Sequence, residues 1–592
     1  MESTKEEPES EIQPPSGPQT RPRGKMVWAI VIVVVLIVAG LAAAFMAGWI
    51  GGNKGHEGLV VAMSSDVETM DPSKTSAMYG PVGMVLETLI TRDKAGAYQP
   101  GLADSYAWNL TDPSHPKFVM HLKEGVTFQD GTPFNAQAVK DIVKWYKQNN
   151  SAGDYGWVSY EFAAINCDDG LGSWTSSWQK MDQGIWAKGP YDLVFNCSYY
   201  DVALIFNLSH LYGSMMSPTA AFASGATLEE AHMNYGTPAH PAVGTGPFKI
   251  TEWKPGDHVT LVKFANHTWG FNWYTNKGPA QIDKIVYRVI TDESSRFAGF
   301  ESGAIDVLMQ VPPSKVQSYA NNTDMTVLTG PGQGTYHIEF NCNASRDVPW
   351  TSVPLRRAIG FAIDRQAIVT TVWHGYAAPG VNYLSPIEPE GALIPAIYNY
   401  SFDLTKAATL FAQAGWTKGT NGWLQNTTTH VELTLALKTT NKGEDVLMSE
   451  MLQSQLATAG VHVTLTQYSE STLRSMAASG DLDAMLFWYS WPRAEILDWH
   501  FGAWAADGGS NTAHYKDAVF GGYVDNWTYA PTPAAFTENA TRAHERLLEN
   551  GPWAPIIFWH QIAAVHNYVK GWYLSPLGQE QVIDGSDVYI SK

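Results

Sequence analysis

The C-terminal third of the chain contains two alternating runs of apolar and polar residues and one apolar run, with helical spacing in the stretches between them. Three segments are predicted to be strands: 431–437 and 461–468, which alternate, and 483–489, an apolar run typical of a buried strand. Two segments between them have the spacing of helices: 443–460, which ends at Gly460, and 471–478. Strands separated by helices predict parallel strands with right-handed crossovers, and therefore an α/β fold.

The same alternation occurs earlier in the chain. The run FVMHL (118–122) predicts a strand, and Asp130 with Gly131 predicts a turn. Asn135 is a suitable N-cap for the helix that follows. The apolar face of this helix is formed by Val139, Ile142, Val143 and Tyr146.

An aromatic stretch, FWYSWPRAEILDWHFGAW (487–504), follows the last of these predicted strands. In open parallel sheets ligands bind at the carboxyl ends of strands, which is where this stretch begins. The cluster therefore favours a wall of a binding site, although each ring taken singly is equally consistent with a cover over the sheet end. The candidate ligand-binding residues are Trp488, Tyr489, Trp491, Arg493, Tyr79 and Asn341.

The N-terminal segment predicts where the chain resides. Residues 1–25 are rich in Glu, Pro and Ser and predict a disordered tail, and 26–50 form an uncharged apolar run long enough for a transmembrane helix. Basic residues precede this helix, so we expect a cytoplasmic tail, a linker over 51–57, and an extracytoplasmic remainder anchored in the cell membrane by a single pass. A cleaved signal peptide is the alternative.

Composition supports an outside location and excludes some partners. About eleven Asn-x-Ser/Thr sequons occur, among them Asn109 and Asn207, which suggests a glycosylated surface. The formal net charge of -19 opposes binding to nucleic acid. The chain has three cysteines, of which Cys167 and Cys197 are able to form a disulfide in an oxidising compartment.

Motifs for catalysis are weak. The glycine-rich run GPGQG (330–334) leads into a strand-like segment rather than a helix, and the chain contains no GxxxxGK[ST] loop, so ATP would be hydrolysed by another subunit. The histidines form no strong metal-ligand spacing, and no cofactor is expected. An acidic, Trp-rich surface glycoside hydrolase is the rival hypothesis, because the many carboxylates of the chain could supply the catalytic pair of such an enzyme.

Six motifs follow one another in the order of a known family. They are QPGLADSYAWN (99–109), LKEGVTFQDGTPFNAQAV (122–139), VGTGPFKITEWKPGD (243–257), RFAGFESGAIDV (296–307), VPLRRAIGFAIDRQAIVTTVWHGYAAPG (353–380) and AATLFAQAGW (407–416). Together they make nearly the whole region beyond residue 58 resemble the family 5 extracellular solute-binding proteins, which are the peptide, nickel and oligosaccharide receptors of ABC importers.

The resemblance implies a two-lobed, hinged, non-catalytic receptor that encloses its ligand between the lobes, with a subdomain inserted in the first lobe. The implied division is 58–92, 243–333 and 553–592 for lobe 1, 93–242 for the inserted subdomain, and 334–552 for lobe 2. The strand-like segments 334–341 and 554–565 are expected to cross between the lobes. Paired crossings let lobes rotate with few backbone changes.

The resemblance also bears on the ligand. Peptide receptors of this family hold the ligand's amine with an Asp in a stretch similar to GWxGDxxDP, but here Trp491 or Pro492 occupies that position. In dipeptide-binding relatives an Arg takes the ligand's carboxylate, and here Thr439 or Thr440 stands in the matching region. We expect peptides or oligopeptides as ligand, with oligosaccharides second, and delivery to an ABC permease with separate ATPases.

Overall fold

The computed structural model describes residues 58–74, 80–148, 184–346, 348–387, 393–490, 493–506, 509–574 and 586–591. The predicted tail, anchor and linker over 1–57 lie outside this set, as do Tyr79, Trp491 and Cys167. Predictions about them, including the pairing of Cys167 with Cys197, therefore stay predictions. No helix in the described stretches is long and apolar enough to cross a membrane.

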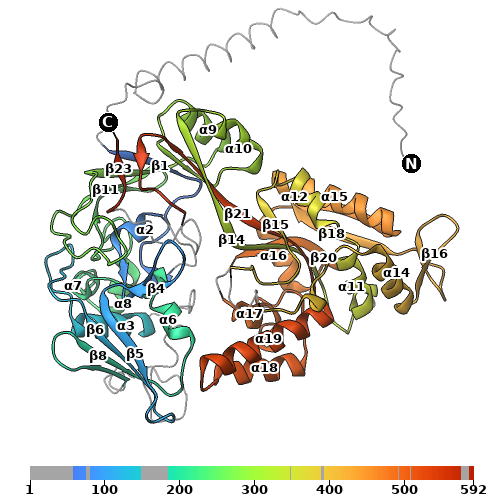
Figure 1. The fold of residues 1–592 in the computed structure, drawn as a ribbon, viewed down its shortest axis with the longest axis horizontal. Coiled ribbons are helices and arrows are strands. Elements are labelled where there is room, and N and C mark those ends of the chain that lie inside the picture. Colours follow the sequence, from blue (N-terminus) through green and yellow to red (C-terminus); the bar gives the residue numbers. More distant parts are fainter. Residues whose placement is uncertain are drawn as a thin grey trace, which may run out of the picture.

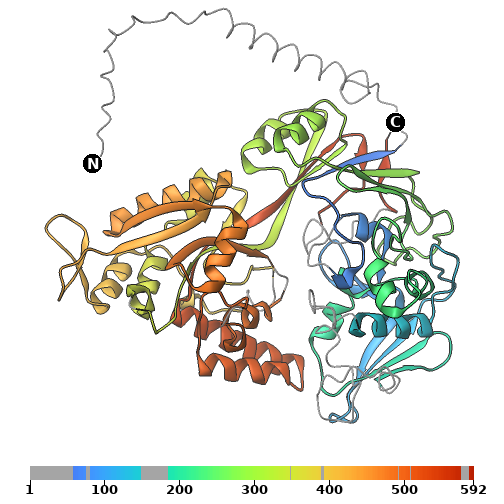
Figure 2. The same cartoon turned by 180° about the vertical axis from the view of Figure 1, so that it is seen from behind.

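Two lobes share one eleven-stranded sheet (Figures 1 and 2). Its strands follow one another in the order β10 (Phe248–Lys254), β11 (His258–Lys263), β12 (Lys284–Val289), β1 (Leu59–Met63), β13 (Val307–Met309), β21 (Trp553–His566), β14 (Met325–Phe340), β20 (Ala484–Ser490), β18 (Thr434–Thr440) and β19 (His462–Tyr468), and β15 (Ala377–Pro379) pairs with β21. Each lobe has its own large hydrophobic core, and the sheet passes from one core to the other.

The first lobe adds a second, four-stranded sheet to its part of the main sheet. This second sheet has the order β5 (Ala103–Asn109), β6 (Lys117–Leu122), β8 (Asp192–Asn196) and β7 (Ile185–Ala187). Its Phe118 belongs to the same core as Leu59 and Val259 of the main sheet, and Val588, near the C-terminus, lies in that core as well. Three short strand pairs complete the lobe: β2 (Glu87–Thr88) with β9 (Ser214–Met215), β3 (Ile90–Arg92) with β4 (Tyr98–Pro100), and β22 (Val569–Lys570) with β23 (Tyr589–Ile590).

Helices cover the first lobe. They are α2 (Gly80–Val85), α3 (Ala136–Gln148), α6 (Ala203–Asn207), α7 (Pro218–Phe222), α8 (Leu228–Asn234), α9 (Glu293–Glu301) and α10 (Pro313–Ala320). Asn135 caps α3 as predicted, because its Oδ1 accepts a hydrogen bond from the backbone N–H of Ala138 at 3.0 Å. The predicted apolar face of α3 is fully buried.

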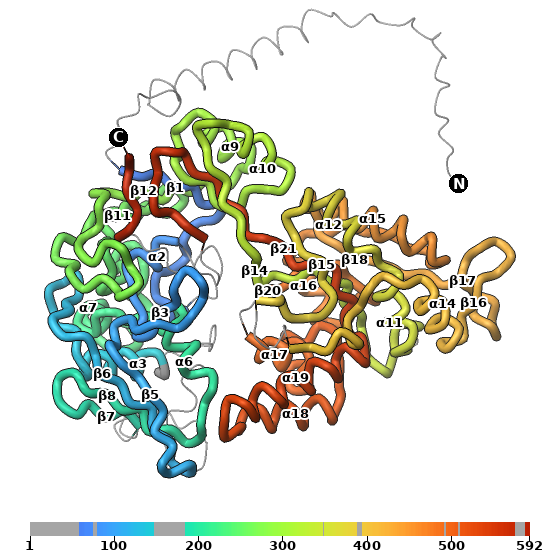
Figure 3. Tube along the Cα trace, in the orientation of Figure 1, coloured from blue at the N-terminus to red at the C-terminus, as the bar shows by residue number. Residues whose placement is uncertain are grey.

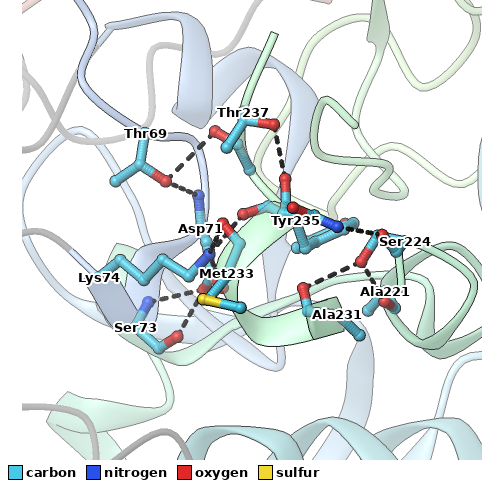
Figure 4. A network of polar contacts seen from close by, with 12 residues as sticks. Thr69, Asp71, Ser73, Lys74, Ala221, Ser224, Ala231, Met233, Tyr235 and Thr237 are labelled. Carbon is cyan, nitrogen blue, oxygen red and sulfur yellow. Dashed lines mark hydrogen bonds and ion pairs between the residues drawn. The ribbon is translucent and has the colours of Figure 1, made fainter. Parts of the chain in front are cut away.

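A polar network fastens the segment 69–74 to the turn that follows α8 (Figure 4). The Lys74 ammonium donates to the carbonyl oxygen of Tyr235 at 2.7 Å, and Thr69 Oγ1 donates to that of Gly236 at 3.2 Å. The Asp71 carboxyl is fully buried and accepts from Ser73 Oγ at 2.6 Å. Burial raises the pKa of Asp71 and lowers that of Lys74. These contacts fix the chain up to Lys74, just before the segment that contains Tyr79.

The second lobe has the predicted parallel arrangement. Strands β19 and β20 both pair in parallel with β18. Gly460 ends helix α15 in the left-handed conformation, with φ of 97°, as the sequence predicts. The helices of this lobe are α11 (Val353–Phe361), α12 (Arg365–Thr371), α14 (Leu404–Gln413), α15 (Gly443–Ala459), α16 (Glu470–Ser479), α17 (Ile496–Phe501), α18 (Ala518–Thr528) and α19 (Pro533–Asn550), and β16 (Trp416–Lys418) with β17 (Leu424–Asn426) forms a hairpin.

One strand boundary in this lobe differs from the prediction. The strand expected over 431–437 begins at Thr434 instead. The carbonyl oxygen of Val431 accepts from the N–H of Asn426 at 2.9 Å, and the N–H of Leu433 donates to the carbonyl oxygen of Leu424 at 2.8 Å. Residues 431–433 therefore extend the β16–β17 hairpin, and the alternating pattern alone does not reveal which partner a strand takes.

Strands β14 and β21 connect the lobes, and the predicted crossing segments lie in them (Figures 1 and 3). They pair antiparallel, with a shift in register between Pro331 and Thr335. A Cβ atom at Gly334 would lie 1.7 Å from the ring of Trp559 on β21. The glycine-rich run therefore allows a close approach of the two connecting strands, which is a structural task rather than phosphate binding.

Candidate functional site

A pocket lies at the carboxyl end of β20, next to the strands that connect the lobes. It is small, with free space for about one water molecule. Its walls come from β14, β20, α17, β21 and the segment 383–385, and consist of Gln333, Thr335, Tyr383, Leu384, Ser385, Tyr489, Ile496, Leu497, His500 and Trp553. This is the sheet edge at which ligands bind in α/β folds.

Tyr489 is the predicted site residue that lines this pocket. It pairs with Thr335 of β14 in the ladder, and Thr335 also pairs with Phe558 of β21. One residue of β14 thus joins the pocket wall to both connecting strands. The ring of Tyr489 meets that of His500 edge to face, with 3.8 Å between the centroids.

His500 reaches the pocket from α17, the short helix that follows the aromatic stretch. Its ring centroid lies 5.0 Å from that of Trp553, the first residue of β21. Only 8 % of His500 and 3 % of Trp553 is exposed. Burial lowers the pKa of His500 to about 3, so the ring is neutral at physiological pH.

Three polar groups of the pocket wall lack a hydrogen-bond partner among the described residues. They are the Thr335 hydroxyl, both ring nitrogens of His500 and the indole N–H of Trp553. A buried polar group without a partner costs about 1–3 kcal/mol, so such groups are uncommon in a protein interior and are frequent where a ligand binds.

A second histidine lies behind the pocket. The ring of His337 stacks on Trp553 with 3.7 Å between centroids. Burial lowers the pKa of His337, while Glu339, whose carboxylate lies 3.6 Å from its Nε2, opposes that change. The Glu339 carboxylate also accepts from Thr512 Oγ1 at 2.5 Å. The Glu339 carboxylate therefore contacts His337 and Thr512, which do not line the pocket.

Trp488 lies beside the pocket but not in its wall. Successive residues of a strand point to opposite faces, so Trp488 and Tyr489 diverge. The Trp488 ring meets Trp559 edge to face at 5.8 Å, and the Lys442 ammonium lies 5.6 Å from its centroid. Its role in ligand binding stays a prediction.

Arg493 connects the lobes. Its Nη1 atom donates to the carbonyl oxygen of Ala203 at 3.2 Å and to Asn207 Oδ1 at 3.4 Å, both on α6. Its guanidinium also lies over the ring of Phe206 and pairs with Glu495. Arg493 is thus committed to contacts between lobes, and direct contact with a ligand stays a prediction.

Asn341 has a structural environment. Its Nδ2 donates to the carbonyl oxygens of Gly480 and Leu482 at 3.2 and 3.1 Å, and its Oδ1 accepts from the N–H of Asn343. Only 1 % of the residue is exposed. The Asn341 amide thus holds the loop before β20, and its role in ligand binding stays a prediction.

Most of the pocket wall was not predicted from the sequence. His500 stands inside the aromatic stretch, but nothing in its neighbourhood along the chain shows that it meets residues of β14 and β21. Thr335 lies in one of the segments predicted to cross between lobes (334–341), and Trp553 immediately precedes the other (554–565), so these segments were the signal that the sequence offered. No group of three or more metal-ligating side chains occurs among the described residues.

Two hydrophobic cores joined by a pair of strands, with a pocket beside those strands, define a two-lobed fold. The chain belongs to the bacterial extracellular solute-binding proteins, family 5, whose family model matches residues 97–504. Membership confirms the resemblance seen in the sequence.

Known proteins agree with this assignment. The glutathione-binding protein GsiB of Shigella flexneri is 24 % identical over 549 residues, covering 91 % of this chain and 95 % of the relative. Two solved structures share the fold at 19 % identity. The oligopeptide-binding protein AppA of Bacillus subtilis, in complex with a nonapeptide, has a TM-score of 0.67 and covers 90 % of this chain and 99 % of its own. NikZ of Campylobacter jejuni, in complex with Ni(L-His), has a TM-score of 0.69 and covers 89 % and 97 %.

Family membership decides between the classes of function considered from the sequence. These relatives are binding proteins, so the chain is a receptor of the extracellular solute-binding family and not an enzyme. The hypothesis of a surface glycoside hydrolase is wrong.

Proposed function

We propose that this protein is the membrane-anchored receptor of an ABC importer, and that it captures short peptides between its lobes and delivers them to a permease driven by separate ATPases. Relatives described as binding glutathione and a nonapeptide support a peptide ligand. The fold supports capture by lobe closure, because two paired strands connect the lobes.

The observation that carries this proposal is the composition of the pocket wall. Thr335 and Trp553 belong to the strands that connect the lobes, whereas Tyr489 and His500 belong to the second lobe. A ligand group in this pocket would therefore contact the connecting strands directly. Binding would favour one arrangement of the lobes over another to the extent that it contacts them differently.

The surrounding carboxylates favour a peptide that is not held by its amine. Glu495 is paired with Arg493, and Asp498 accepts from the indole N–H of Trp504 at 3.1 Å. Burial raises the pKa of Asp498 to about 6, which weakens it further as a partner for an ammonium group. We infer a ligand held by its backbone and by pockets for its side chains.

Thermal unfolding of the full-length chain in mild detergent tests the ligand class. The arms are glutathione, pools of peptides of two to nine residues, and malto-oligosaccharides. A ligand at about a hundredfold its dissociation constant stabilises the folded state by about 2.7 kcal/mol, which raises the melting temperature by several degrees. A response to the sugars alone would replace the peptide assignment with the oligosaccharide alternative, and no response in any arm would refute both.

The anchor is tested separately in the native membrane. We propose that 26–50 remains attached, because no cysteine stands near its end for a lipid anchor. The protein should stay in the membrane fraction after alkaline carbonate washing, and its mature N-terminus should precede residue 26. A mature N-terminus between residues 44 and 52 would show cleavage instead.

A further inference from the structure

The three unpartnered groups of the pocket share one chemical property, which is that each is able to donate a hydrogen bond. The indole N–H of Trp553 is a donor only, the Thr335 hydroxyl donates one proton, and a neutral imidazole donates through one nitrogen. Among the described residues, those that line the wall include no carboxylate, lysine or arginine. An acceptor group fits these donors, whereas an ammonium group finds no anionic partner here.

The charges around His500 also favour an acceptor that carries negative charge. Burial is the main cause that lowers the pKa of His500; His337 on β14 and, less strongly, Arg474 on α16 lower it further, and the backbone of Ser510 raises it. Tyr489 and Trp553 pack against the ring without charge. Glu339, the carboxylate behind the pocket, is held by Thr512.

We propose that this pocket is a subsite for a carboxylate group of the ligand, which accepts hydrogen bonds from Thr335, Trp553 and His500. The inference rests on the proposed function and specifies the ligand chemistry at one end of the site. Two sources supply such a group, the C-terminus of a peptide or the side chain of a Glu or Asp residue. Charge-assisted bonds of this kind are stronger than neutral ones.

The subsite predicts that binding takes up a proton. The empty pocket holds a neutral His500 ring because burial lowers its pKa to about 3. A carboxylate in contact with the ring raises that pKa, since an opposite charge favours the protonated form. Affinity for a carboxylate ligand therefore increases as the pH falls from 8 to 5.

Two substitutions separate this role from a structural one. His500→Leu removes a buried, unpartnered imidazole at similar volume, so the ligand-free protein should be as stable as wild type or more so. The same change should weaken carboxylate peptides by roughly tenfold or more, the value expected when a hydrogen bond to a charged group is lost. His500→Gln keeps a donor and should retain much of the affinity.

His232 provides a matched control in the other lobe. Its Nε2 is also without a partner, and its ring meets Trp145 edge to face at 3.9 Å. His232→Leu removes a similar imidazole far from the pocket. It should leave peptide affinity unchanged.

The experiment is isothermal titration calorimetry on the full-length chain at pH 5 to 8, in buffers of different protonation enthalpy. The probes are three tetrapeptide pools: one with free C-termini and no acidic residue, one amidated with Glu at varied positions, and one amidated with Gln. We expect one carboxylate-bearing pool to bind best, with proton uptake that His500→Leu abolishes. The pool that binds identifies whether the carboxylate comes from the C-terminus or a side chain.

The outcomes distinguish this inference from the proposed function. If peptides bind wild type and His500→Leu equally, or if binding does not depend on pH, the pocket holds only water and the subsite is wrong while the receptor remains. Preference for the Gln pool over the Glu pool and the free C-termini also overturns it. If no pool binds wild type, both the peptide receptor and the subsite fail.

Discussion

Arg493 of the second lobe donates a hydrogen bond to the carbonyl oxygen of Ala203 in the first, across 3.2 Å. A second contact between the lobes lies nearby, where the rings of Tyr199 and Tyr529 meet edge to face at 5.4 Å. Burial raises the pKa of Asp201 to about 6, and the charge of Arg493 opposes that rise. The two lobes thus contact each other directly in this structure, without a ligand.

Arg493→Ala should shift the lobes toward an open arrangement. A hydrogen bond from a charged donor contributes about 1.5–3 kcal/mol, so we expect a larger radius of gyration in small-angle X-ray scattering and a severalfold weaker peptide affinity. Arg546→Ala is the control, because Arg546 pairs with Asp517 inside the second lobe at 2.7 Å. An equal expansion in both variants would show general loosening rather than loss of a contact between lobes.

Tyr489→Ala should weaken peptide binding by about 0.5–1.5 kcal/mol or more, because it removes a ring from the pocket wall. Trp488→Ala should have a smaller effect if the ligand lies in the pocket, since Trp488 is on the opposite face of β20. Trp491→Ala tests the remaining aromatic candidate from the sequence. Calorimetric dissociation constants rank the three, and a dominant effect of Trp488→Ala would place the ligand on the other face.

Gly334→Ala should destabilise the protein, because the added Cβ would overlap the ring of Trp559. Overpacking of this kind costs about 1–3 kcal/mol. Gly330→Ala is a matched control four residues earlier in the same strand, since a Cβ there meets no atom within 4 Å. Urea denaturation should show a lower midpoint for the first variant only.

The stability of the second lobe should depend on pH through Asp498. Burial raises its pKa to about 6, above the value near 3.9 in an unfolded chain. The folded state then binds the proton more tightly than the unfolded state. Asp498 therefore adds to the free energy of unfolding below about pH 4, and this contribution is lost as the pH rises through 6. Asp498→Asn should reduce this loss of stability between pH 4 and pH 6, by about 1 kcal/mol or less because the group is partly exposed. Denaturation curves identical to wild type at pH 4 to 8 would contradict this.

Glycan occupancy should follow exposure. Asn109, Asn266 and Asn321 stand in sequons and are exposed, whereas Asn207 is only 5 % exposed and contacts Arg493. Mass spectrometry of peptides from the native protein should find glycans at exposed sequons and none at Asn207. Occupancy of Asn207 would require addition before folding and would prevent the contact between lobes.

The sequence predicted the elements whose signals are local. The cap at Asn135 and the stop at Gly460 depend on residues adjacent in the chain, and both are present. Parallel strands in the second lobe followed from alternation of strands and helices. The start of β18 was missed, because Val431 continues the alternation while its backbone pairs elsewhere.

The candidate site was harder to predict because it is assembled from distant segments. Tyr489 was found, since it ends a recognisable strand at the ligand-binding edge of the sheet. His500 lies far from Thr335 and Trp553 in the sequence and lines the same pocket only in the folded protein. Hydrophobic periodicity does not predict such long-range proximity. Arg493 was correctly placed near the gap between lobes, but a sequence does not distinguish a side chain that waits for a ligand from one that contacts the other lobe.

The paired strands that connect the lobes have a consequence for the evolution and engineering of the molecule. Tyr336 on β14 and Ile557 on β21 both belong to the core of the second lobe, near the points where the chain enters and leaves it, and they are paired in the ladder. The whole lobe is therefore one uninterrupted insertion whose two ends lie side by side, as in domains that tolerate transplantation. Exchanging the second lobe between relatives requires only two junctions, which lie next to each other. Such an exchange would transfer the ligand specificity that this lobe determines from one receptor to another.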